Sequence, residues 1–166
     1  MRRTLWLVRH AKSSWKHVDL ADRDRPLNKR GTRDAAAMAR RLAQRSLRPQ
    51  RIITSPALRA RRTAEAMAAA FGLEPEALVV DERIYDATVE GLLGVVRTLP
   101  PAQERAMLVG HQPGMGELVE ALAGTAIAKF PTCAVAELAL DGVAWPEASE
   151  GCAALVGVEA PKDDDG

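Results

Sequence analysis

The sequence predicts an α/β fold, a single-domain three-layer α/β/α sandwich whose central sheet is mostly parallel with an antiparallel edge. Several short apolar runs show no alternation, which is typical of strands buried on both faces of a parallel sheet. Amphipathic helical patterns separate the first of these runs, as in chains that alternate strand and helix. The last third of the chain instead has two apolar strand patterns with no helical pattern between them, and this pair predicts the antiparallel edge.

Length and composition agree with one soluble domain. The chain has 166 residues, enough for a full hydrophobic core. We predict a domain over residues 1–160 and a short acidic tail over residues 161–166. Hydrophobic residues make up 47% of the sequence and charged residues 27%, as in soluble globular proteins. The net charge of +1 argues against nucleic acid or a membrane surface as a partner.

The sequence also bears on compartment and on metal binding. The first apolar run, Leu5 to Val8, is too short for the core of a signal peptide, and no run is long enough to span a membrane. Cys133 and Cys152 are therefore predicted to be thiols in a reducing cytoplasm. The three histidines show no metal-ligand spacing, so we predict no metal site and no cofactor.

The first predicted strand, Leu5–Val8, ends abruptly at Arg9 and His10. A polar loop from Lys16 to Arg25 follows. Asn28 is a predicted N-cap for a helix that extends to about Gln44. Its buried stripe is spaced i, i+3, i+4 and i+7, at Ala35, Met38, Ala39 and Leu42.

The second strand, Arg51–Thr54, leads into Ser55 and Pro56, which predict a helix start with a serine cap and proline in the first helical position. This helix is expected to end near Ala70, with Gly72 as its stop. Its first turn contains Arg59. Its surface allows an ion pair between Arg61 and Glu65, one turn apart.

Two more strands are predicted over Leu78–Val80 and Ala106–Val109, with a helix from about Val89 to Leu99 between them. His111 follows the second of these strands and precedes another helix, for which Pro113 suits the first turn and Gly124 the end. The closing strands are predicted over Ala134–Leu140 and Ala153–Val158.

Three strand–helix junctions thus supply side chains suited to phosphate. His10 with Arg9, then Arg59, then His111 all follow strands, and the carboxyl ends of parallel strands form the ligand crevice of open α/β sheets. An imidazole can attack phosphorus, and guanidinium groups bind phosphoryl oxygens in pairs. Lys12 and Ser13 either line the same site or merely turn the chain.

Five sequence blocks resemble those of the histidine phosphatase superfamily, and most closely those of its short, SixA-type branch of protein-phosphohistidine phosphatases. The blocks are LVRHAKSSW, DRDRPLNKRG, SPALRARRTAE, LVGHQPG and FPT, at residues 7–15, 22–31, 55–65, 108–114 and 130–132. The resemblance implies a phosphoglycerate mutase-like fold. The sequence departs from the common family pattern at Ala11, Arg62 and Gln112.

By this resemblance, His10 is the nucleophile that becomes phosphorylated, and Arg9, Arg59 and His111 bind the phosphoryl group. The implied enzyme is a metal-independent phosphatase that removes phosphate from a phosphohistidine-bearing protein substrate and releases inorganic phosphate. The alternative is a phosphatase or mutase of a small phosphoester on the same site. A non-catalytic module that binds phosphate or nucleic acid is disfavoured, because the chain offers few aromatic residues for base stacking.

The proton donor stays open at the sequence level. Larger family members supply a carboxylate with the help of an inserted subdomain, for which this chain is too short. By their order in the chain, the candidates are Glu82, Asp86, Asp22 and Asp24.

Overall fold

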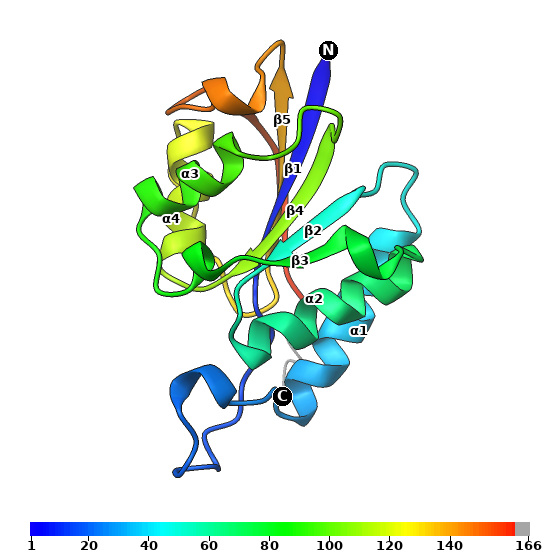
Figure 1. Ribbon diagram of the computed structural model, residues 1–166, viewed down its shortest axis with the longest axis vertical. Helices are drawn as coiled ribbons and strands as arrows, with labels where there is room; N and C mark the ends of the chain where they lie inside the picture. Colours follow the sequence, from blue (N-terminus) through cyan, green and yellow to red (C-terminus); the bar gives the residue numbers. More distant parts are fainter. Residues whose placement is uncertain (162–166) are drawn as a thin grey trace.

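The six strands within residues 1–161 form one sheet with helices on both faces (Figure 1). The computed structural model describes residues 1–161, and its strand order is β3-β2-β4-β1-β5-β6. The strands β1 to β4 pair in parallel, β5 runs antiparallel to β1, and β6 runs antiparallel to β5. The predicted sheet is therefore confirmed, with strands at Arg2–Arg9, Arg51–Thr54, Leu78–Val80, Arg105–Gly110, Val135–Asp141 and Ala154–Glu159.

The helices pack in two pairs on opposite faces of the sheet (Figure 1). Alternate residues of β1 enter the two cores: Trp6 packs in the cluster with α1 and α2, and Leu7 in the cluster with α3 and α4. This arrangement confirms the three layers. The helices are α1 (Lys29–Ala43), α2 (Leu58–Phe71), α3 (Val89–Arg97) and α4 (Gly114–Ala123), with short 3-10 turns η1 (Asp22–Asp24), η2 (Pro75–Ala77), η3 (Glu82–Ile84) and η4 (Trp145–Glu147).

Most predicted helix ends are confirmed. The Asn28 side chain caps α1 by accepting the Gly31 N–H at 2.7 Å. Gly72 and Gly124 end α2 and α4 in the left-handed conformation, with φ of 68° and 66°, which glycine adopts without steric cost.

Two predicted helix starts are wrong. The helix α2 begins at Leu58 rather than at Pro56, and the Ser55 hydroxyl accepts the Ala57 N–H in a tight turn that precedes it. Pro113 stands just before α4 instead of inside its first turn. The predicted Arg61–Glu65 ion pair is also wrong, because Arg62 bonds Glu65 at 2.9 Å.

A close approach fixes the loop after β1 against α1. A Cβ atom on Gly31 would lie 2.0 Å from the carbonyl oxygen of Lys12, so only glycine fits in this first helical turn. The same carbonyl accepts the Asn28 N–H at 3.0 Å. The segment that follows His10 is thereby held beside the start of α1.

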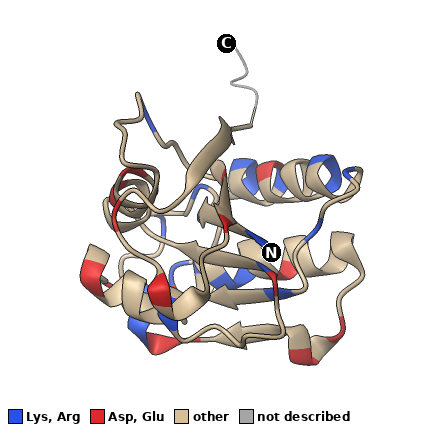
Figure 2. Ribbon diagram, turned by 90° about the horizontal axis from the view of Figure 1, so that it is seen from above, with Lys and Arg blue, Asp and Glu red and all other residues tan. Residues whose placement is uncertain are grey.

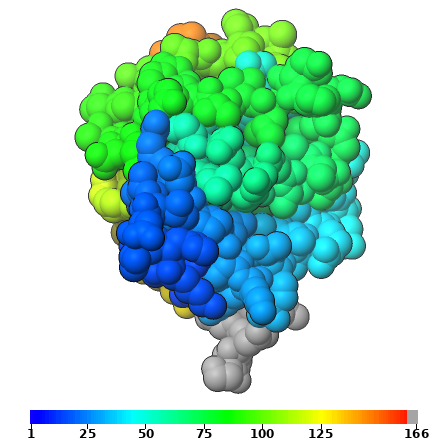
Figure 3. All heavy atoms as spheres, turned by 60° about the horizontal axis from the view of Figure 1, so that its bottom comes forward, coloured from blue at the N-terminus to red at the C-terminus, as the bar shows by residue number. Residues whose placement is uncertain are grey.

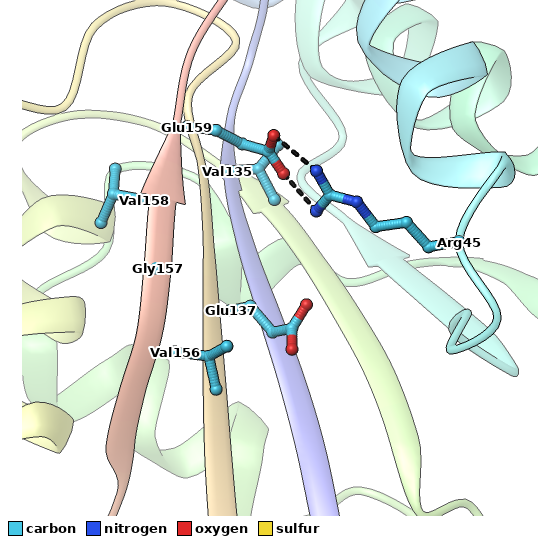
Figure 4. A pocket seen from close by; sticks show the side chains of 7 residues that line it. All are labelled: Arg45, Val135, Glu137, Val156, Gly157, Val158 and Glu159. Atoms are coloured by element: carbon cyan, nitrogen blue, oxygen red, sulfur yellow. Dashed lines mark hydrogen bonds and ion pairs between the residues drawn. The ribbon is translucent and has the colours of Figure 1, made fainter.

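Charged side chains are distributed unevenly over the two helical layers. Basic residues predominate on α1, whereas α4 has two glutamates and no basic residue (Figure 2). Beyond the end of α1, Arg45 reaches the sheet edge and donates to both carboxylate oxygens of Glu159, beside a groove over β5 and β6 (Figure 4).

None of the helices within residues 1–161 is long and apolar enough to cross a membrane. Apart from Pro161, the predicted acidic tail lies outside the described residues.

Candidate active site

Strand register brings two histidines together at the carboxyl edge of the sheet. Arg9 at the end of β1 pairs with Gly110 at the end of β4, so the residues that follow, His10 and His111, emerge side by side. Their ring centroids are 5.2 Å apart. They line one pocket of about 330 Å³ together with every other predicted site residue, namely Arg9, Lys12, Ser13 and Arg59.

The His10 ring is held in one protonation pattern. Its Nδ1 lies 2.7 Å from the carbonyl oxygen of Ala11, and because a carbonyl only accepts, Nδ1 bears the proton. Burial, and then the nearby arginines, lower the pKa of His10 to about 4, although the Ala11 hydrogen bond opposes this. His10 is therefore neutral at pH 7, with the lone pair on Nε2. The Ala11 N–H donates to the buried Thr63 hydroxyl of α2 at 3.0 Å, which anchors this turn.

Arg59 is fixed by an acidic residue from the loop after β1. This buried guanidinium donates to the Asp22 carbonyl oxygen at 2.7 Å and to its carboxylate at 3.0 Å. The carboxylate also accepts from the Tyr85 hydroxyl at 2.5 Å and from Arg25 Nε at 3.2 Å. The Tyr85 hydrogen bond, followed by those of the arginines, lowers the pKa of Asp22 to about 2. Asp22 therefore stays ionised and orients the cations around it.

The His111 side chain is partly buried at the start of the loop between β4 and α4. Its Nε2 is 2.7 Å from the Ser55 hydroxyl, at the end of β2, and Tyr85 packs edge-on against its ring at 5.6 Å. Burial first, and then the charges of nearby cationic groups, lower the pKa of His111 to about 3. In the absence of an anion, this histidine is neutral at pH 7.

Arg25 adds a third guanidinium to the pocket. It is only 8% exposed, it donates to the Ser13 hydroxyl at 2.8 Å, and it stacks on the Trp15 ring at 3.6 Å. Buried arginines are rare unless they are paired. Ser13 thus has a structural partner in Arg25, while the exposed Lys12 lies at the pocket rim.

Three buried nitrogen atoms of pocket residues have no hydrogen-bond partner within residues 1–161. They are Arg9 Nε, Arg59 Nε and His111 Nδ1. Unpaired buried polar atoms are uncommon in native structures and indicate strain or a polar ligand. Their concentration at one cationic pocket favours a site for an anion.

Comparison with known proteins decides the family. The sequence profile of the histidine phosphatase superfamily (branch 1) matches residues 5–89, just over half of the chain. The chain belongs to this superfamily. Its relatives include an uncharacterised chloroplastic protein of Arabidopsis thaliana, 37% identical over 88% of this chain and 70% of that protein. An uncharacterised protein of Mycobacterium tuberculosis is 33% identical over 93% of this chain and 100% of that protein.

Solved structures of the superfamily share the whole fold. A protein from Agrobacterium tumefaciens, assigned as the phosphohistidine phosphatase SixA, is 31% identical in sequence to this chain, and the two structures superpose with a TM-score of 0.79. The match covers 96% of this chain and 98% of the Agrobacterium chain. A Nakamurella protein with the same assignment is 26% identical with a TM-score of 0.81, and the match covers 98% of both chains. The histidine phosphatase fold is therefore shown for this chain, and the superfamily is one of hydrolases with a histidine nucleophile.

The structure separates the four candidate proton donors. Glu82 forms an ion pair with Arg23 and is not among the residues that line the site, and neither is Asp24. Asp22 and Asp86 line a second lobe of about 340 Å³, which shares Arg59 and His111 with the histidine pocket. Since Asp22 is ionised, Asp86 is the candidate left in the cleft.

Sequence reasoning missed several residues that line this candidate site. Ser55 was predicted to be a helix cap, and Arg25 was predicted to be a loop residue. The available signal for Arg25 was its place in the DRDRPLNKRG block, three residues before the N-cap of α1. Thr132 belongs to the FPT block but was given no role in the site, and Tyr85 gave no local signal, because only the tertiary fold brings it to the cleft. Among residues 1–161, no group of three or more His, Cys, Asp or Glu side chains could hold a metal ion.

The depressed histidine pKa values predict acid-sensitive stability. Below pH 6.5 the unfolded chain takes up protons at His10 and His111, whereas the folded site does so only near pH 4 and pH 3. The free energy of unfolding should therefore fall between pH 7 and pH 5, on the order of 2 kcal/mol for each histidine. Asp22, with a pKa of about 2, does not titrate in this window. Urea unfolding at both pH values measures the change.

Two variants isolate these histidines. In the double variant His10→Gln/His111→Gln, the free energy of unfolding should differ much less between pH 7 and pH 5 than in the unmodified protein. His17→Ala, which removes an exposed histidine, should leave that difference intact. An unchanged pH dependence in the double variant would show that other groups cause it.

Proposed function

We propose that this chain is a phosphohistidine phosphatase that acts through a covalent phosphohistidine at His10. One observation carries the proposal: a neutral imidazole with a free Nε2 lies in a pocket lined by the guanidinium groups of Arg9, Arg25 and Arg59. Phosphoryl transfer needs an in-line nucleophile and positive charge around three phosphoryl oxygens, and this pocket offers both.

In the first step, His10 Nε2 attacks the phosphorus atom of a phosphohistidine whose distal ring nitrogen is protonated. The P–N bond to the substrate breaks, and its electron pair stays on the leaving nitrogen. The substrate therefore departs as a neutral imidazole without a general acid. Arg9 and Arg59 hold phosphoryl oxygens, and the negative charge of the bound group favours protonation of His111. Lys12 and Ser13 complete the rim.

In the second step, water attacks the phosphorus atom of phosphorylated His10. The proton stays on His10 Nδ1, which donates it to the Ala11 carbonyl oxygen in a hydrogen bond, so the ring again leaves as a neutral imidazole. The products are free His10 and dihydrogen phosphate, which keeps both protons of the water. The hydrogen bond that sets the tautomer of the nucleophile thus also makes it a good leaving group.

The leaving group separates this proposal from the runner-up, a small-phosphoester phosphatase. An alkoxide is a poor leaving group and depends on a well-placed acid. Asp22 is ionised and Asp86 is exposed, so neither is the buried, protonated carboxyl group that such a reaction requires. The likeness to proteins assigned as SixA supports the nitrogen-linked substrate.

We therefore expect higher kcat/KM on phosphohistidine proteins than on sugar phosphates. The measurement is phosphate release from a panel of proteins phosphorylated on histidine with phosphoramidate, beside a panel of small phosphoesters. Because the favoured reaction needs no carboxylic acid, Glu82→Gln and Asp86→Asn should each change it less than about tenfold, or 1.4 kcal/mol. Faster turnover of a phosphoester, lost in either variant, would favour the runner-up.

A further inference from the structure

Large apolar side chains gather on the loop between the nucleophile strand and α1. Trp15 is 76% exposed, Val18 90% and Leu20 41%, and all three fall within six residues. We call these three residues the apolar crest. Figure 1 shows this loop, in blue, projecting beyond the end of β1, and Figure 3 shows the same blue segment as a ridge on the surface. Single exposed apolar residues are ordinary, but a cluster beside a cationic pocket is not.

The base of the crest is held rigidly against the pocket. The Arg25 guanidinium stacks on the Trp15 ring at 3.6 Å, and Arg25 is itself bonded to Asp22, Ser13 and the Ser14 carbonyl. Trp15 lines the histidine pocket, whereas Val18 and Leu20 do not. The crest therefore begins at the pocket and continues outward, past the space that a small substrate in the pocket would fill.

We propose that the apolar crest is the docking surface for the protein that bears the phosphohistidine. This inference rests on the proposed function and adds the chemistry of the partner: an apolar patch next to the phosphorylated residue. A phosphoryl group in the pocket places the surrounding surface of its protein over Trp15, Val18 and Leu20. The exposed Lys12 lines the pocket just before the crest, whereas the exposed Lys16 and Asp19 lie between crest residues. An acidic residue of the partner beside the phosphohistidine therefore complements Lys12 at the pocket side of the crest.

The test compares one reaction on two substrates. The first is the phosphohistidine protein with the highest kcat/KM in the panel above, and the second is the free amino acid phosphohistidine. Val18→Asp and Leu20→Asp should each lower kcat/KM at least tenfold on the protein, since a carboxylate is costly to bury in an apolar contact. Both should change kcat/KM on free phosphohistidine less than twofold, because neither residue lines the pocket.

The chain offers matched controls away from the site. Val156→Asp on the edge strand β6 and Leu47→Asp after α1 replace residues that are 53% and 39% exposed. They should leave both reactions unchanged. If the crest variants behave like these controls on the protein substrate, the docking proposal is wrong while the proposed function stands. If no phosphohistidine protein is hydrolysed by the unmodified enzyme, the proposed function itself fails.

Discussion

Replacing His10 by alanine is expected to lower kcat/KM on a phosphohistidine protein about 10⁴-fold, which corresponds to about 5.4 kcal/mol of lost transition-state stabilisation. The reason is that the proposed reaction passes through a bond between His10 Nε2 and phosphorus, and no other group in the pocket is a neutral nucleophile with its tautomer fixed. Steady-state phosphate release by the purified variant measures the effect.

The control for this variant is His17→Ala. His17 lies in the exposed loop after β1 and does not line the pocket, so its loss should leave turnover of free phosphohistidine within about twofold. Circular dichroism and urea unfolding at pH 7 should show that His10→Ala is folded. A folded His10→Ala protein with near-normal turnover would rule out the covalent mechanism.

Replacing Arg59 by alanine has the second largest expected effect, a loss of about 10²–10³-fold in kcat, or 2.7–4 kcal/mol. Two reasons combine. The variant loses a guanidinium from the proposed phosphoryl pocket, and it leaves the ionised Asp22 carboxylate without its Arg59 partner beside an incoming anion. Vanadate inhibition should weaken in parallel, because vanadate mimics the pentacoordinate phosphorus of the transition state.

The helix α2 supplies two comparisons for Arg59→Ala. Arg62→Ala removes an exposed arginine that bonds Glu65 on the same helix, and it should have little effect on kcat. Arg59→Lys keeps the positive charge but loses the planar pair of donors, so it should recover only part of the activity. Equal activity of Arg59→Ala and Arg62→Ala would remove Arg59 from the proposed mechanism.

Local sequence patterns were enough to predict the central strands and most helix ends. The unbroken apolar runs at Leu5–Val8 and Ala106–Val109 became the central strands β1 and β4. Asn28 and Gly124 marked helix ends correctly, because caps depend on their own side chain or backbone conformation. The convergence of His10 and His111 followed from the rule that parallel strands share one carboxyl edge.

The contacts that complete the site depend on tertiary structure. Asp22 and Tyr85 are 63 positions apart in sequence, yet their hydrogen bond joins the first loop to the segment after β3. The Ser55 hydroxyl could either cap the helix that follows it or bond a histidine from another strand. The sequence favoured the helix cap, because that partner is close along the chain, whereas the structure places Ser55 beside His111. Arg25 resembled any solvated arginine until the fold buried it between Trp15 and Asp22.

The central claim is the covalent phosphohistidine at His10, and trapping it is the most direct test. The enzyme is mixed for milliseconds with an excess of a ³²P-labelled phosphohistidine protein, quenched in alkali, digested and analysed by mass spectrometry. We expect label on the peptide that contains His10, stable in alkali and labile in acid, and none on the enzyme in His10→Ala. Rapid phosphate release with no label on the enzyme, or label at His111 instead, would contradict the account.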